Sequence, residues 1–147
     1  MNRLIAVANI SFSNTYTLYY KCSSYHWNLE TFDFTQFHDF FGDMYSEIYG
    51  SVDNFAEFIR TLDGYAPISL AEILKNAAIK EDTTKPKTLL EMLSNITRDN
   101  NLTIESLDAT FKEAIAANEQ GFANFIAERL AAHKKHAWKL RSINKGK

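Results

Sequence analysis

Apolar residues recur at steps of three and four along most of this chain, the spacing that places side chains on one face of an α-helix. Long segments with this spacing cover residues 3–28 and 33–62, then run from residue 88 to a break at Gly121 and onward to about residue 143. None of the chain shows the alternation of apolar and polar residues that is typical of a half-buried strand. The pattern therefore predicts an all-α fold of four long helices.

The second and third helices are joined by a long connection, residues 63–87. Pairs with capping spacing stand at three helix starts: Asp33 with Gln36, Ser69 with Glu72, and Thr88 with Glu91. The middle pair predicts a short helix inside the connection, ending near Lys80. Four helices with one long crossover describe a ferritin-like bundle, here with a short extra helix in the crossover.

The chain's length and composition fit one globular domain. It has 147 residues, of which 46% are hydrophobic and 23% charged. Its single cysteine, Cys22, excludes an internal disulfide and fits a reducing compartment. The apolar run at the N-terminus is too short for a signal peptide or a membrane span. We therefore expect one domain over residues 1–147, in the cytoplasm and without a membrane span.

Charge is spread unevenly along the chain. The net charge is −2, yet residues 133–147 carry six Lys or Arg and no acidic residue. We expect a short basic tail at about residues 144–147. The candidate DNA contacts are the cations of this end: Lys139, Arg141, Lys145 and Lys147. Alternatively, these cations only complement the dipole at the C-terminus of the last helix.

The predicted second helix carries a second stripe, spaced at three and four residues. Its members are His38, Gly42, Ser46, Gly50, Asp53 and Glu57. A glycine inside a helix costs roughly 1 kcal/mol relative to alanine, so two on one stripe indicate that another backbone passes close by. Asp53 and Glu57 are one turn apart and can share a cation. The plainer alternative is a core histidine and a solvated acidic face.

One copy of this helix cannot assemble a site from these residues. His38 and Asp53 are separated by fifteen positions, roughly 22 Å along a helix. A second, antiparallel copy related by a two-fold axis near Tyr45 and Ser46 would place His38 of one chain opposite Asp53 of the other, twice per dimer. His26 ends the first helix beside the turn into the second and can complete the site. Imidazoles with carboxylates suit iron or zinc.

These residues resemble the signature of the Dps family of miniferritins. The matching positions are His26-Trp27-Asn28, Phe34, His38, Asp53 through Glu57 and Gly64, with Glu128, His133, Trp138, Leu140 and Arg141 in the last helix. The resemblance implies a cytoplasmic shell of twelve subunits built from two-fold dimers, found at the nucleoid if it binds DNA. Its ferroxidase sites would take His26 and His38 from one subunit and Asp53 and Glu57 from its neighbour, with Trp27 beside them. The implied activity is oxidation of Fe(II), typically by hydrogen peroxide, and storage of ferric iron against oxidative damage. Zinc is a possible substitute for iron at the same ligands.

Three positions depart from the family pattern. Glu30 stands where glycine is usual, Phe58 where arginine often follows a glutamate, and Gly42 where many members carry an acid. Gly42 removes a ligand for a second iron and keeps another interpretation open: a ferritin-like oligomer with a degenerate iron site, acting as a structural, DNA-binding or interaction protein. His133 is expected in the core and His136 on the surface, neither with a carboxylate partner.

Overall fold

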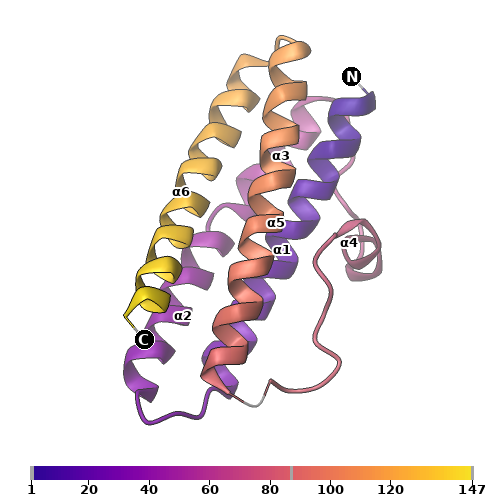
Figure 1. Ribbon diagram of the computed structural model, residues 1–147. Coiled ribbons are helices and arrows are strands. Elements are labelled where there is room, and N and C mark those ends of the chain that lie inside the picture. The colour runs from indigo at the N-terminus through magenta and orange to yellow at the C-terminus, as the bar shows by residue number, and fades with distance from the viewer. Residues whose placement is uncertain (1, 87, 147) are drawn as a thin grey trace.

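The computed structural model describes residues 2–86 and 88–146, and in these ranges the protein is all-helical (Figure 1). The helices are α1 (Asn2–Asn28), α2 (Phe34–Tyr49), α3 (Val52–Thr61), α4 (Leu70–Asn76), α5 (Leu89–Ala116) and α6 (Gln120–Lys145). Figure 1 shows α1, α2, α5 and α6 side by side, with α4 outside them next to α1. The predicted all-α class and the short extra helix in the crossover are confirmed. In the described ranges, no helix is long and apolar enough to cross a bilayer.

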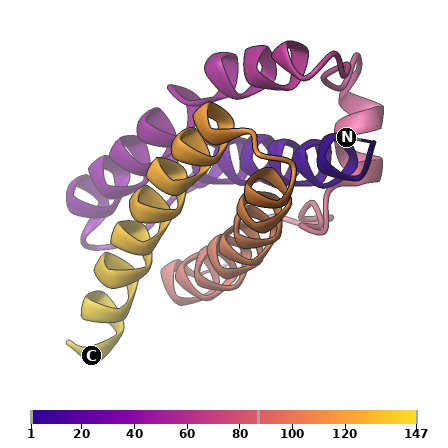
Figure 2. The same ribbon diagram turned by 90° about the horizontal axis from the view of Figure 1, so that it is seen from above.

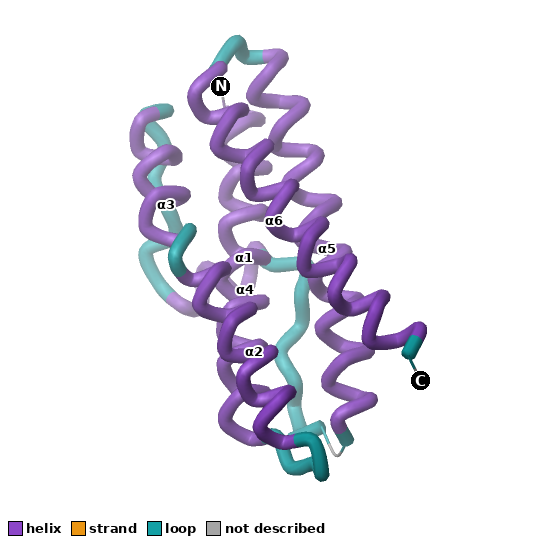
Figure 3. The backbone as a smooth tube through the Cα atoms, turned by 90° about the vertical axis from the view of Figure 1, so that its left-hand side faces the viewer, coloured by secondary structure: helices purple, strands orange, loops and turns teal. Residues whose placement is uncertain are grey.

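The predicted second helix is two helices, so the expectation of one continuous helix over residues 33–62 is wrong. Figures 2 and 3 show α3 following α2 after a bend. At the bend, the Oγ of Ser51 donates to the carbonyl of Ile48 at 2.7 Å, and the backbone N–H of Ser51 donates to the same oxygen at 3.1 Å. These short-range bonds replace a regular helical step, and Gly50 beside them has little intrinsic helix preference.

Two of the three predicted caps form. The Oγ of Ser69 accepts from the backbone N–H of Glu72, and Thr88 makes a full capping box with Glu91. Asp33 precedes α2 with a backbone of φ −91° and ψ 36°, and the structure gives its side chain no capping hydrogen bond in the described part of the chain. That backbone lies outside the extended region in which a side chain reaches the first helical amides.

Two other helix ends differ from the prediction. The short helix stops at Asn76 rather than near Lys80, because Ala77 turns to an extended backbone with ψ 138°. Between α5 and α6 the chain turns at Asn118, whose φ is 59°, a conformation that asparagine tolerates. Gly121, predicted as the break, lies inside the first turn of α6.

The bundle core has two apolar parts separated by polar side chains. One part surrounds Phe55 and Ile126 near α3, and the other surrounds Phe41 and Ile96 near the opposite end. The apolar residues spaced at three and four over residues 33–62 are buried as predicted, except Val52, which is half-buried; the buried ones are Phe37, Phe41, Met44, Ile48, Phe55, Ile59 and Leu62. Hydrogen-bonded polar side chains of α1, α5 and α6 lie between the two parts: Asn14, Asn100, Ser106 and His133.

Side chains of α1, among them Asn14 and Lys21, tie the crossover to this helix. The Oδ1 of Asn14 accepts from the backbone N–H groups of Ala78 and Ile79, at 2.8 and 3.3 Å. The Nζ of Lys21 donates to the carbonyl of Lys80 at 2.7 Å. These bonds hold the chain between α4 and α5 against α1, and Lys85 farther along the crossover pairs with Glu30 of the α1–α2 turn at 2.6 Å.

Candidate metal centre

His26 and His38 lie together where α1 turns into α2. The Nδ1 of His26 is 2.6 Å from the backbone oxygen of His38, and the Nδ1 of His38 is 2.7 Å from the backbone oxygen of His26. A carbonyl oxygen only accepts, so each Nδ1 carries the proton. The Nε2 of each neutral ring therefore keeps its lone pair for a metal ion. Hydrogen bonds that orient the imidazoles in this way are typical of metal-ligating histidines.

The two imidazoles are also stacked. Their ring centroids are 3.7 Å apart and their planes differ by 14°. On its other side the ring of His38 stacks on Phe34, with centroids 4.9 Å apart, while Tyr45 packs near His26 at 5.3 Å. Both histidines are half-buried. Aromatic packing and the reciprocal hydrogen bonds together hold the pair in one geometry.

Asp53 and Glu57 lie elsewhere in the same chain. They occupy the first two turns of α3, both exposed, at the far end of α2 from the histidines (Figure 3). In residues 2–86 and 88–146, no three histidine, cysteine, aspartate or glutamate side chains gather as a possible metal site. The structure thus brings His26 and His38 together and leaves the two carboxylates apart from them.

Trp27 follows His26 and points outward. Its side chain is 59% exposed, and its ring makes an edge contact with Tyr20 at 6.2 Å. Tyr20 is also exposed, so this aromatic pair forms an open apolar surface on α1 beside the histidines. Surface of this kind indicates contact with another macromolecule.

A charged network between α2 and α6 was missed by the sequence analysis. Arg129 donates to both carboxylate oxygens of Glu47, and the Nε2 of His136 lies 2.8 Å from Oε1 of the same group. The prediction of an exposed, unpaired His136 is therefore wrong: it is buried against a carboxylate because α2 covers that face of α6. The spacing of Arg129, His133 and His136, at positions i, i+4 and i+7, was the available signal.

Burial and charge shift two pKa values in this network. Partial burial alone would raise the pKa of Glu47, but hydrogen bonds from His136 and Arg129 outweigh it and hold the pKa well below 4.5. His133 is fully buried, as predicted; its Nδ1 donates to Oδ1 of Asn100 at 2.9 Å. Burial first, and then the charges of Arg129 and His136, hold the pKa of His133 well below 6.5. The network joins α2 to α6 through Glu47.

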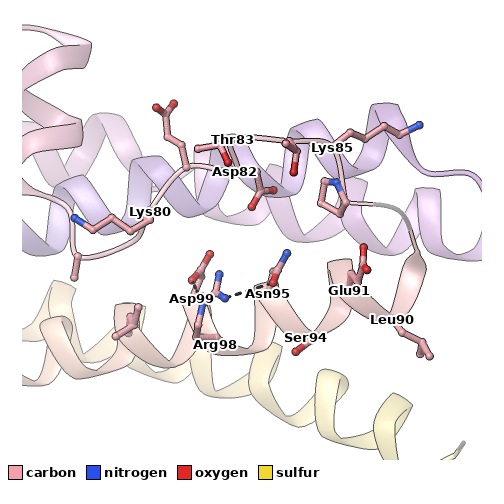
Figure 4. A pocket seen from close by; sticks show the side chains of 15 residues that line it. Lys80, Asp82, Thr83, Lys85, Leu90, Glu91, Ser94, Asn95, Arg98 and Asp99 are labelled. Carbon is pink, nitrogen blue, oxygen red and sulfur yellow. Dashed lines mark hydrogen bonds and ion pairs between the residues drawn. The ribbon is translucent and has the colours of Figure 1, made fainter.

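A cavity of about 980 Å³ lies between the crossover and α5 (Figure 4). Its walls carry both signs of charge, and the charged groups at its base are bonded to one another. The hydroxyl of Tyr25 donates to Oδ2 of Asp82 at 2.6 Å and accepts from Nδ2 of Asn95 at 3.0 Å. The Nε of Arg98 lies 2.9 Å from Oδ1 of Asp99. The two bonds of Tyr25 link α1, the crossover and α5, so they hold the cavity wall together.

The candidate DNA-contacting cations lie on the last turns of α6. Lys139, Arg141 and Lys145 are exposed. The tail expected at residues 144–147 is helical through Lys145, and Gly146 follows it in a turn. Lys147 lies outside the described residues. The basic end is therefore presented by a helix rather than by a free segment.

An all-helical bundle with a crossover helix and two imidazoles at the α1–α2 turn defines a protein of the ferritin-like class. A family model described as a ferritin-like domain matches residues 5–146. The DNA protection during starvation protein of Brevibacillus brevis is 29% identical over 97% of this chain and 96% of its own length. Antigen TpF1 of Treponema pallidum is 32% identical over 84% of this chain and 70% of its own length.

A solved structure gives the same result for the fold. The crystal structure of a Dps protein from Bacillus brevis matches with a TM-score of 0.90 and 27% identity, covering 97% of this chain and 95% of that one. The chain therefore belongs to the Dps proteins of the ferritin-like family. The predicted ferritin-like bundle and the resemblance to this family are confirmed.

Proposed function

We propose that this protein is a miniferritin that oxidises Fe(II) with hydrogen peroxide and stores the ferric product inside a hollow shell. The observation that carries the proposal is the His26–His38 pair. Reciprocal Nδ1–H bonds leave both Nε2 lone pairs available to a metal ion and orient the two rings. Two histidines that only packed in the core would not both need the tautomer in which Nδ1 carries the proton.

The pair supplies half of the proposed ligand set. Two carboxylates would come from Asp53 and Glu57 of a second copy, since these groups are exposed and remote from the histidines of their own chain. Two imidazoles with two carboxylates suit Fe(II), and zinc could occupy the same ligands. A site of this kind leaves coordination positions open for the oxidant. In the proposed reaction two Fe(II) ions give two electrons to peroxide, whose O–O bond breaks, and two protons complete two water molecules.

The surface around α1, α2, α3 and α4 supports association with a second copy. It exposes large apolar side chains: Tyr20, Trp27, Phe34, Tyr49, Leu70 and Leu74. A two-fold dimer would cover such a surface and repeat each contact, which yields two equivalent sites. We propose that six such dimers form a twelve-subunit shell in the cytoplasm, with Trp27 beside each site.

A second candidate function follows from Gly42, which offers no carboxylate near the histidines. In that case the shell is a structural or DNA-binding assembly with a degenerate iron site. The exposed cations Lys139, Arg141 and Lys145 favour DNA as its partner, and a nucleoid location would follow.

The test is Fe(II) oxidation by the purified assembly, followed by absorbance with hydrogen peroxide and separately with oxygen. Light scattering on the same sample gives the mass of the particle. We expect fast peroxide-dependent oxidation by a particle of about twelve subunits, and loss of this activity in His38→Ala. A shell that oxidises iron no faster than buffer, or a His38→Ala variant as active as the parent, would contradict the proposal and favour the second function.

A further inference from the structure

Gly42 lies directly beneath the imidazole of His26, one turn after His38 on α2. A Cβ atom placed on Gly42 would lie 2.9 Å from Cε1 and 3.0 Å from Nδ1 of His26. Carbon atoms in favourable contact are roughly 3.5–4.0 Å apart. Any side chain at position 42 would therefore displace the ring from its place against the helix.

Space, rather than backbone conformation, is the reason for this glycine. No described glycine has a positive φ, so α2 does not need glycine for its backbone at position 42. Gly50, the other glycine of the stripe, stands at the end of α2, where a Cβ would meet the carbonyl oxygen of Ser46 at 3.3 Å. The sequence pattern suggested that another backbone passes close to both glycines. At Gly42 the space is instead filled by the imidazole of His26 from the same chain.

We propose that Gly42 is a positioning residue of the metal site. The missing side chain lets the ring of His26 lie on α2, where its Nδ1 reaches the carbonyl of His38 and its face stacks on the second imidazole. Because the ring of His26 lies so near the backbone of Gly42, a residue with a carboxylate cannot occupy position 42 unless the ring moves. Position 42 then supplies no carboxylate for a second ion, so we expect the site to take one metal ion per chain. The metal part of this inference rests on the proposed function; the placement of the ring does not.

The test uses the assembled protein with Gly42→Ala and Gly42→Asp, and Co²⁺ alone as the probe. Gly121→Ala is the matched control, since a Cβ there meets nothing within 4 Å. Crystal structures of the metal-free proteins show the imidazole positions, and visible absorption gives Co²⁺ affinity and the number of ions bound per chain. We expect one Co²⁺ per chain in the parent and in Gly121→Ala. Gly42→Ala should separate the stacked rings and weaken Co²⁺ binding by roughly 10–100-fold, and Gly42→Asp should do the same despite its added carboxylate.

Thermal unfolding separates positioning from a general defect. Alanine is a better helix former than glycine, so Gly42→Ala should raise the melting temperature once the ring is removed by His26→Ala. In the parent background, where the methyl group meets the ring, the same substitution should give no such rise. The two melting-temperature changes still show whether Gly42 makes room for His26 if Gly42→Ala alone assembles poorly.

Several outcomes would overturn the inference. They are stacked imidazoles with parental affinity in Gly42→Ala, a second Co²⁺ per chain in Gly42→Asp, or an equal rise in melting temperature in both backgrounds. If the parent and every variant bind no Co²⁺, the proposed function fails. The crystal structures would still show whether Gly42 sets the place of His26.

Discussion

Lys21 of α1 and Asp99 of α5 form an ion pair with Nζ 2.5 Å from Oδ2, although their side chains are only 4% and 1% exposed. Lys21 also donates to the carbonyl of Lys80, and Asp99 accepts from Arg98. Buried charges are tolerated when hydrogen bonds of this kind satisfy them. The pair therefore joins α1, the crossover and α5 at one point.

Breaking this pair from one side should destabilise the fold strongly. Lys21→Met leaves the carboxylate of Asp99 buried with less compensation, and Asp99→Leu does the same to the ammonium group. We expect each substitution to lower the free energy of unfolding by about 3–5 kcal/mol in urea titrations. The double variant should lie much closer to the parent, because an apolar pair leaves no unpaired charge. A double variant that loses the sum of both single effects would contradict this account.

The charged network on α6 should make the protein less stable in mild acid. The fold lowers the pKa of His133. Below pH 6.5 the unfolded chain therefore binds a proton that the folded chain does not bind, and the free energy of unfolding decreases as the pH decreases. The lowered pKa of Glu47 adds a second loss below pH 4.5, because there the carboxylate takes up a proton in the unfolded chain while the folded chain keeps it ionised beside Arg129. The slope from one such proton is at most about 1.4 kcal/mol per pH unit.

A variant of His133 isolates its share of this effect. His133→Gln keeps hydrogen-bonding groups near Asn100 but does not titrate. Melting temperatures from pH 7.5 to 5 should therefore fall less steeply in the variant than in the parent. Parallel curves would show that another group causes the acid sensitivity.

Sites shared between subunits should be restored by mixing two inactive variants. His38→Ala and Asp53→Ala each remove one half of every site in a homo-oligomer. In a mixed two-fold dimer, one site combines the intact His38 of one chain with the intact Asp53 of the other. With random pairing, roughly a quarter of all sites are intact in a co-refolded equal mixture. Peroxide-dependent Fe(II) oxidation should return to about that fraction of the parental rate.

The control for this experiment mixes variants that damage the same half. His26→Ala with His38→Ala leaves no intact pair in any combination, so its mixture should stay inactive. Recovery in that control, or none in the first mixture, would exclude a site built from two chains.

DNA binding, if it occurs, should depend on the exposed cations of α6. Replacing Lys139, Arg141 and Lys145 by glutamine should abolish it, since phosphate contacts by cations supply most non-specific affinity. The matched control removes three exposed lysines elsewhere: Lys75, Lys80 and Lys112. In gel-shift titrations of the parent, affinity should fall steeply between about 50 and about 200 mM salt. Binding that is insensitive to salt, or equal loss in the control, would exclude this surface.

Local patterns in the sequence were sufficient for the helical class and for most of the buried helix faces. Apolar spacing marks the buried face of a helix wherever it folds, which is why the stripe through Phe41 and Phe55 is buried as predicted. The caps at Ser69 and Thr88 form because they need only four consecutive residues. The break at Ser51 was missed because it arises from a side-chain bond that competes weakly with the helix.

The sequence by itself thus determined an all-α bundle with a long crossover, and its spacing predicted the histidines and carboxylates of the candidate metal site. Only the tertiary structure decided that His26 and His38 lock each other's tautomer, that Gly42 makes room for one ring, and that Glu47 pairs with His136. Helical periodicity depends on neighbours three and four residues away. These contacts depend on how separate helices are placed against each other, and one-dimensional spacing does not specify that placement.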